Sequence, residues 1–203
     1  MTTRILFATR SAGKQRELRQ LAASLPVEVV FPDDVGLFER SDEELLENAD
    51  TFEGNARRKA EHFVRLSGLP TLADDSGLEV LSLGGAPGVR SKRFAAATEN
   101  QDAANNAELL RRLRGAPKAR RTARYRCVMV WIEKVGAVTH TFEGDCSGSI
   151  LEEPRGTGGF GYDPLFLSAE LGETFGEASA EKKHAVSHRG RAFQAFAAWL
   201  KAR

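Results

Sequence analysis

The segment with the clearest chemical potential is residues 73–77, which read Ala-Asp-Asp-Ser-Gly. Asp74 and Asp75 follow a short apolar run that predicts a strand over residues 71–73, and open α/β sheets place their sites at such strand ends. Two adjacent carboxylates repel each other unless a cation or hydrogen-bond donors neutralise them, and a hard divalent cation such as Mg²⁺ suits carboxylate oxygen together with phosphate. The alternative is an Asx-type turn that leads into Gly77 and binds nothing.

A second candidate is the turn that follows the apolar run of residues 5–9. Ser11, Gly13 and Lys14 stand at the expected start of a helix, where free N–H groups, the helix dipole, a hydroxyl and an ammonium suit phosphate oxygens. The segment is not a Walker A loop, because Gln15 follows Lys14 where Ser or Thr is required. The alternative here is an ordinary strand-to-helix turn with a solvated lysine.

Residues 156–161 contain the spacing G-x-G-x-x-G, but their context excludes the dinucleotide-binding motif. Pro164 comes three residues after the last glycine, so no helix follows directly. The sequence instead predicts a loop that brings backbone amides, Phe160, Tyr162 and Asp163 close to a ligand. An aromatic ring in such a loop can stack on a base.

His184 and His188 are four residues apart, which is the spacing of a zinc-binding pair on one helix. The glutamate of the H-E-x-x-H motif is absent, and Ser187 is expected to cap the last helix and so to break the shared face. We therefore favour a cationic, hydrogen-bonding cluster of Lys183, His188 and Arg189 at the start of that helix.

Composition limits the classes of partner. With 203 residues, 41% of them hydrophobic, the chain is expected to form one domain without disulfide staples. Its 29 basic and 28 acidic residues leave a net charge of +1, so no overall electrostatic field favours binding of nucleic acid. The basic run over residues 111–126 is interpreted as a solvated helix end and loop.

The sequence also favours a soluble, cytoplasmic protein. Cys127 and Cys146 fall in expected strands at no metal-ligand spacing, as is typical of thiols in a reducing compartment. No apolar stretch approaches the length needed to cross a bilayer.

The elements that must position these residues alternate between strands and helices. Strands are expected at residues 5–9, 27–31 and 71–73, with long strands between residues 122 and 150. Helices are expected after residue 13 up to Pro26, from a capping pair at Asp50 and Glu53 to about Ser67, over 101–113, and over 192–200. Residues 32–50 are expected to form a loop with at most a short helix. The pattern predicts a mixed α/β fold with a long-stranded central sheet.

Taken together, these segments resemble the inosine triphosphatase-like family of dITP/XTP pyrophosphatases, which act on non-standard purine nucleotides. The matching segments occur in the family's order over nearly the whole chain: Lys14 with Arg16-Glu17-Leu18, Thr51-Phe52, Asn55-Ala56, Lys59-Ala60, residues 73–78, residues 84–88, residues 156–164, Glu181-Lys182-Lys183 and residues 187–190. Each segment alone is weak, whereas the ordered set is specific.

The resemblance implies one domain over residues 1–203, an α/β fold with a long mixed central sheet flanked by helices, and two lobes with the active-site cleft between them. It implies a homodimer that hydrolyses dITP, ITP and XTP to the monophosphate and pyrophosphate with Mg²⁺. By position, Asp75 would be the catalytic base, and Glu47 and Asp75 would bind the metal. The residues expected to bind substrate are Thr9, Arg10, Ser11, Ala12, Gly13, Lys14, Lys59, Ser76, Phe160, Gly161, Tyr162, Asp163, Lys183, His188 and Arg189.

The phosphate loop departs from the family's usual Thr-Gly-Asn, because here it reads Thr9-Arg10-Ser11. Serine still donates to a phosphate oxygen, but over a shorter reach than an asparagine amide. Arg10 lacks the backbone freedom of glycine and is expected to add a charge-assisted phosphate contact.

Two other functions fit the same residues. The first is a related enzyme that clears modified pyrimidine or methylated nucleotides with the same metal chemistry. The second is a nucleotide- or RNA-binding protein without turnover. Substrate preference separates the first from the purine hypothesis, and the effect of Asp75→Asn on pyrophosphate release separates the second.

Overall fold

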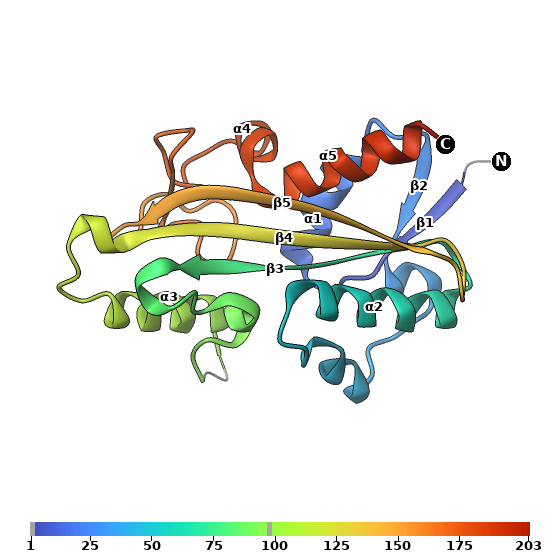
Figure 1. The fold of residues 1–203 in the computed structure, drawn as a ribbon, viewed down its shortest axis with the longest axis horizontal. Helices are drawn as coiled ribbons and strands as arrows, with labels where there is room; N and C mark the ends of the chain where they lie inside the picture. The colour runs from blue at the N-terminus through green and yellow to red at the C-terminus, as the bar shows by residue number, and fades with distance from the viewer. Residues whose placement is uncertain (1–2, 97–98) are drawn as a thin grey trace. The chain divides into compact units, whose positions relative to one another are not determined.

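The computed structural model describes residues 3–96 and 99–203. Its strands form a six-stranded mixed sheet with the strand order β2-β1-β3-β4-β5-β6. β1 pairs in parallel with β2 and β3, whereas β6 pairs antiparallel with β5. The strands are β1 (Thr3–Phe7), β2 (Val27–Val30), β3 (Thr71–Val80), β4 (Thr122–Ile132), β5 (Thr139–Ile150) and β6 (Phe166–Ser168). The predicted α/β class with a long mixed sheet is confirmed (Figure 1).

Five α-helices and five short 3-10 helices accompany the strands in the described part of the chain. The α-helices are α1 (Ala12–Ala22), α2 (Phe52–Ser67), α3 (Gln101–Arg112), α4 (Ala180–Val186) and α5 (His188–Lys201). The 3-10 helices are η1 (Pro32–Val35), η2 (Ser41–Glu47), η3 (Leu81–Leu83), η4 (Gly88–Arg93) and η5 (Lys118–Arg121). None of the helices described is long and apolar enough to span a membrane.

The chain divides into two compact units, each made of several segments. The first unit contains the residues up to Asp75 together with 127–143 and 192–203, and the second contains 76–126 and 144–191. The expectation of a single domain stays a prediction.

In the first unit, the strands bury alternate residues on opposite faces. Ile5 and Phe7 pack with α1 and α5, whereas Leu6 and Ala8 pack with α2. This is the two-residue period of an extended strand, and it explains why residues 5–8 are apolar without interruption. α2 and α5 accordingly cover opposite faces (Figure 1).

α2 carries the buried polar residues Asn55 and Lys59, and both of its ends have a local cause. Thr51 is the N-cap, and its side chain accepts a hydrogen bond from the N–H of Gly54 at 3.0 Å. The predicted capping pair of Asp50 and Glu53 is therefore wrong by one residue. Gly68 ends the helix in the left-handed region with φ of 67°, as predicted from the glycine.

The second unit has its own apolar core beneath α3. Leu109 of α3 packs with Tyr125, Phe166 and Phe175, and the Tyr125 and Phe166 rings lie 4.7 Å apart between centroids. The glycine-rich segment over residues 156–161 forms turns and irregular structure, as predicted.

Two predicted boundaries are corrected, and one predicted helix start is confirmed. β3 does not end at Ala73 but continues to Val80, so the paired aspartates lie in the middle of a strand. Residues 32–50 contain two 3-10 helices rather than a loop with one short helix. The last helix begins at His188, directly after the predicted cap Ser187, whose hydroxyl accepts from the N–H of Gly190 at 3.1 Å. His184 belongs to the separate helix α4, so the two histidines share no helix, as predicted.

Candidate functional site

Asp75 is held from two directions by α2. The side-chain amide of Asn55 donates to Asp75 Oδ2 at 2.9 Å, and Lys59 Nζ lies 3.8 Å from Asp75 Oδ1. Asn55 and Lys59 reach the same carboxylate because residues four apart lie on one face of a helix. Asp75 is 7% exposed and Asn55 is fully buried, so the surrounding protein fixes the orientation of this carboxylate.

Glu47 joins the same group through Lys59. Lys59 Nζ donates to Glu47 Oε1 at 3.0 Å and to the backbone carbonyl of Asp74 at 2.6 Å. Burial lowers the pKa of Lys59, but the charges of Asp75, Glu47 and Asp74 raise it more. The pKa of Lys59 is therefore held above its ordinary value, and the side chain stays an ammonium. One ammonium therefore lies near two carboxylates, from η2 and β3, and offsets one of their two negative charges.

The two adjacent aspartates face opposite sides of the sheet. Leu72 packs with the α1 side and Ala73 with the α2 side, so the strand period sends Asp74 to the first and Asp75 to the second. Lys14 of α1 accordingly pairs with Asp74, with Nζ 3.0 Å from Oδ2. The carboxylates that look equivalent in the sequence thus bind different lysines.

The segment before α1 leads into a helix start, as predicted, and a side chain caps it. Ser11 is the N-cap of α1, and its hydroxyl accepts from the N–H of Lys14 at 3.5 Å. Thr9 Oγ1 accepts from the N–H of Ser11 at 3.3 Å, while Gly13 is buried and Ala12 is exposed. The guanidinium of Arg10 contacts acidic residues of the same unit, Glu43 and Asp33, each at 2.7 Å.

The donor set around Lys59 fits a hard divalent cation only if further ligands are supplied. The residues described contain no group of three or more His, Cys, Asp or Glu side chains placed to hold a metal. Glu47 and Asp75 offer carboxylate oxygens that already share one cation, and Mg²⁺ commonly takes one or two carboxylates plus water and substrate phosphate. The residues present therefore fit a metal that is bound together with a triphosphate.

In the second unit, Asp163 organises the glycine-rich loop. Its Oδ2 accepts from Lys183 Nζ at 2.6 Å and from the N–H of Phe160 at 2.8 Å, and its Oδ1 accepts from the Tyr125 hydroxyl at 3.4 Å. Asp163 and Lys183 are 2% and 5% exposed, so this is a buried ion pair with additional hydrogen bonds. The pair fixes the segment that carries the Phe160 ring.

The Phe160 ring is flanked by two cations of the same unit. Lys183 Nζ lies 5.2 Å and Arg189 Cζ lies 5.6 Å from the ring centroid, within the range of cation–π attraction. Arg189 also donates to the Ser76 hydroxyl at 2.8 Å. Lys183 and Arg189 thus lie at the same ring, with Ser76 bound to Arg189, and both cations are nearly covered.

His188 and the remaining loop residues have packing partners. The His188 ring stacks on Tyr125 with centroids 4.5 Å apart and an angle of 7° between the planes. Tyr162 is 3% exposed and its hydroxyl donates to the carbonyl of Ser91, so its ring belongs to the core. Gly161 donates its N–H to Asp102 of α3 at 2.7 Å.

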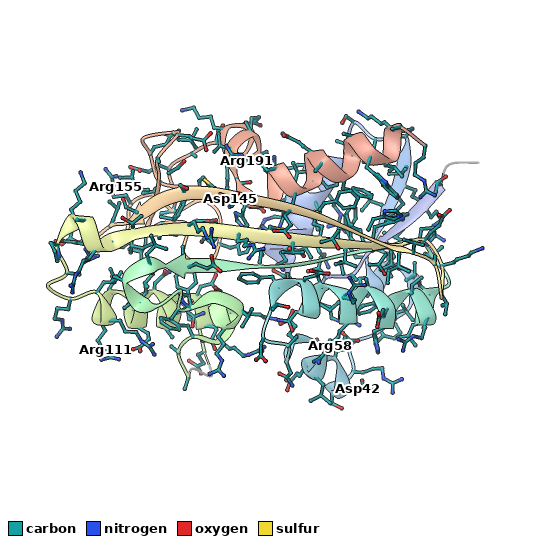
Figure 2. The ribbon with its side chains drawn as sticks, viewed as in Figure 1. Asp42, Arg58, Arg111, Asp145, Arg155 and Arg191 are labelled. Carbon is teal, nitrogen blue, oxygen red and sulfur yellow. The ribbon has the colours of Figure 1, made fainter. Side chains whose placement is uncertain are left out.

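The predicted basic run is only partly a solvated surface. Arg111, labelled on α3 in Figure 2, is exposed and pairs with Glu108 at 2.7 Å. Hydrogen bonds from Arg111 and Arg112 lower the pKa of Glu108 to about 2. Arg121 departs from the prediction, because it is 6% exposed and donates to backbone carbonyls, among them that of Leu113 at 3.2 Å.

Two residues with clear roles in these clusters carry no assigned role in the sequence analysis. Asn55 belongs to a matching segment, and its spacing of four from Lys59 on a helix was the signal that both reach one target. In the sequence, Tyr125 is only one of several alternating residues in an expected strand. Its contacts with Asp163 and His188 join residues far apart in sequence, and strand periodicity carries no information on such pairs.

Comparison with known proteins adds an independent finding, since the model of the Ham1 family matches residues 5–199. The chain belongs to the Ham1 family. Among relatives, the dITP/XTP pyrophosphatase of Desulforamulus reducens is 47% identical, covering 94% of this chain and 92% of that protein. The dITP/XTP pyrophosphatase of Geobacter sulfurreducens is 46% identical, with the same two coverages.

A solved structure agrees with the fold of this family member. The HAM1 protein from Coxiella burnetii superposes with a TM-score of 0.87 at 32% identity and covers 100% of both chains. The resemblance read from the ordered motifs is therefore confirmed. The roles of single residues stay predictions.

Proposed function

We propose that this Ham1 family member hydrolyses dITP, ITP and XTP to the corresponding monophosphate and pyrophosphate. The relatives named dITP/XTP pyrophosphatase, which match over nearly the whole chain, support this activity. The observation in the structure that carries the proposal is the sharing of Lys59 between Glu47 and Asp75. Two carboxylates held around one ammonium suit a reaction in which a polyphosphate and a cation are bound together.

Asp75 is the proposed base. Asn55 and Lys59 fix its carboxylate, and from that position it would orient or deprotonate the water that attacks the α-phosphorus. A bound divalent cation, for which we propose Mg²⁺ held through Glu47 and Asp75, would neutralise the triphosphate and lower the pKa of a coordinated water.

The lysines and the capped start of α1 would bind the leaving pyrophosphate. Lys14 is anchored at Asp74, and Lys59 at Glu47, so both ammonium groups are held in place before a nucleotide arrives. Backbone N–H groups at the start of α1 add donors that favour negative charge. Such preorganised donors stabilise the charge that develops on the leaving group.

The second-unit cluster supplies the residues proposed to recognise the base. Phe160 offers a ring face, and Arg189 and His188 offer donors for a 6-keto oxygen. Adenine carries an amino group at that position, so buried donors would lose their partner, which costs about 1–3 kcal/mol per group. This term favours hypoxanthine and xanthine over adenine.

The proposal includes a homodimer in the cytoplasm. Exposed apolar side chains such as Phe38 (75% exposed) and Leu81 (63%) are consistent with a protein contact. Light scattering on the purified chain tests the dimer, and a single species with the mass of one chain would contradict it.

The deciding experiment is pyrophosphate release across a panel of dITP, XTP, ATP, GTP, dUTP and methylated nucleotides, with and without Mg²⁺. The proposal expects release from dITP and XTP in preference to the others, and only with the metal. Preferred hydrolysis of dUTP or of methylated nucleotides would favour the related pyrimidine- or methyl-directed enzyme. Undiminished turnover by Asp75→Asn would remove the base from its assigned role.

A further inference from the structure

Arg10, between β1 and α1, directs its guanidinium at acidic residues of the first unit. Nε and Nη2 donate to the two carboxylate oxygens of Glu43, each at 2.7 Å. Nη1 donates to Asp33 Oδ1 at 2.7 Å, and Nη2 also donates to the carbonyl of Leu37 at 2.8 Å. The fork-on-fork contact with Glu43 is the strongest geometry available to an arginine and a carboxylate.

These contacts leave the guanidinium little capacity for a phosphate. All three of its nitrogens donate to oxygens of Asp33, Leu37 and Glu43. The side chains of Arg10 and Glu43 are only 16% and 11% exposed, so water screens their attraction weakly. A phosphate would have to displace a carboxylate that is already in place.

The carboxylate partner of Arg10, Glu43, lies on η2, an element with little apolar contact to the core. None of the residues in Ser41–Glu47 is buried, and the side chain of Leu45 is 64% exposed. Only Leu46 packs partly against the core, and 3-10 helices have weaker hydrogen-bond geometry than α-helices. Polar contacts must therefore hold η2 in place.

Glu47 ends η2 and lies between two such contacts. Four residues before it, Glu43 is held by Arg10. Two residues after it, the N–H of Ala49 donates to the side-chain oxygen of Asn55 at 2.8 Å. The backbone on both sides of Glu47 is thus tied to parts of the first unit that have their own buried cores.

We propose that Arg10 is a positioning residue that holds η2, and with it the Glu47 carboxylate, beside Lys59 and Asp75, and that it does not bind phosphate. The inference rests on the proposed function for one point, namely that Glu47 takes part in binding the divalent cation. The mechanical part of it, that Arg10 holds η2, stands on the contacts alone.

Hydrogen exchange of backbone amides tests the mechanical part without any substrate. Arg10→Ala and Glu43→Gln should both speed exchange over residues 41–47 while exchange in α5 stays unchanged. The two single variants remove the same contact, so the double variant should exchange no faster than the faster single variant. Arg10→Lys, which keeps the charge but loses the fork, should lie between Arg10→Ala and the wild type.

Steady-state kinetics tests the link to Glu47. Both single variants should raise the Mg²⁺ concentration needed for half-maximal pyrophosphate release about tenfold, the lower end of the effect of losing an outer partner of a metal ligand. The KM for dITP at saturating Mg²⁺ should stay unchanged. Arg40→Ala is the matched control. Arg40 also pairs with a residue of η2, Asp42, which is labelled in Figure 2, but this pair is exposed. The Arg40→Ala variant should therefore behave as wild type in both assays.

The alternative, that Arg10 binds phosphate, gives the opposite pattern. Arg10→Ala would then raise the KM for dITP, whereas Glu43→Gln, which frees the guanidinium, would leave it unchanged or lower it. That result, or unchanged exchange over residues 41–47 in Arg10→Ala, would overturn the inference. If the wild-type chain releases no pyrophosphate from any nucleotide, the proposed function fails, and the exchange data still decide whether Arg10 holds η2.

Discussion

Asn55 and Asp75 are joined by a buried hydrogen bond of 2.9 Å from the Asn55 amide to Asp75 Oδ2. The other end of the same amide accepts the N–H of Ala49 at 2.8 Å. One side chain of α2 therefore fixes both the proposed base on β3 and the chain that leaves η2 just after Glu47. This arrangement makes Asn55 the junction of the first-unit cluster.

Replacing Asn55 by alanine should therefore impair turnover more than nucleotide binding. Both hydrogen bonds are lost, so Asp75 keeps only its longer contact with Lys59 and Glu47 loses one of its flanking contacts. We expect kcat to fall about 10- to 100-fold, the range observed for outer partners of metal ligands, with a small change in the KM for dITP. Pyrophosphate release at saturating Mg²⁺ measures both quantities.

A buried asparagine of the second unit provides the control for stability. Asn105 is 2% exposed, and its amide bonds the carbonyls of Ser91 and Lys92. Asn105→Ala should reduce the free energy of unfolding as Asn55→Ala does, by about 1–3 kcal/mol for each buried group left unpaired. An equal loss of kcat in both variants would mean that Asn55 acts only through stability.

Lys59→Met tests whether the shared ammonium stabilises the fold. Removing one partner from a buried ion pair typically destabilises by about 3–5 kcal/mol, because the remaining charge is left without a partner. Here two carboxylates, Glu47 and Asp75, would be left facing each other. Urea denaturation at pH 7 should show this loss, and added Mg²⁺ should restore part of it by binding the same carboxylates.

The pH dependence of that loss has a definite sign. The pKa of Lys59 in the folded protein is raised above its ordinary value of 10.5. A cation whose pKa is higher in the folded than in the unfolded protein stabilises the fold. That stabilisation is fully present below the pKa of the unfolded state and is lost as the pH rises through the pKa of the folded state. The stability difference between wild type and Lys59→Met should therefore be constant from pH 7 to 9 and shrink above about 10.5.

An exposed lysine serves as the matched control for this experiment. Lys134 lies at an exposed position between β4 and β5 in the same unit. Lys134→Met should change the free energy of unfolding by no more than about 0.5 kcal/mol at any of these pH values, as is usual for surface substitutions. A Lys59→Met variant as stable as this control would show that the carboxylates do not depend on the ammonium.

The parts of the fold that could be predicted from the sequence are those set by short-range rules. α2 ends at Gly68 and α3 starts at Gln101 as predicted, because a glycine stop and a helical period are local signals. The predicted end of β3, at residue 73, is wrong because the signal that would extend the strand is not local. In the sequence, Asp74 and Asp75 resemble the end of a strand, yet Asp74 pairs with Lys14 and Asp75 lies near Lys59. A lysine far away in sequence leaves no mark on a local pattern.

The candidate site shows the same division. The family resemblance implies roles for Glu47, Lys59 and Asp75, and the structure brings these three residues together. For Arg10 the sequence predicted a phosphate contact from its charge and position. Its geometry depends on Glu43, which lies 33 residues away in a segment with weak patterning, so no local rule could reveal the pairing.

Gly159 offers a test of the second-unit cluster. It has φ of 72°, and a Cβ at this position would collide with the Asp163 carboxylate that binds Lys183 and the N–H of Phe160. Gly159→Ala should therefore displace Asp163 and, with it, the Phe160 ring. We expect a higher KM for dITP with a smaller change in kcat, because this cluster is proposed to bind the base and not the reacting phosphate.

Gly172→Ala separates the collision from backbone strain. Gly172 has a φ of 69° and belongs to the same unit, but nothing lies within 4 Å of the Cβ that alanine would add. Both variants should lose about 1–2 kcal/mol of stability from the left-handed backbone alone, which urea denaturation measures. Only Gly159→Ala should also raise the KM for dITP, and an equal rise in Gly172→Ala would show that loop strain, and not the position of Asp163, sets the affinity for the nucleotide.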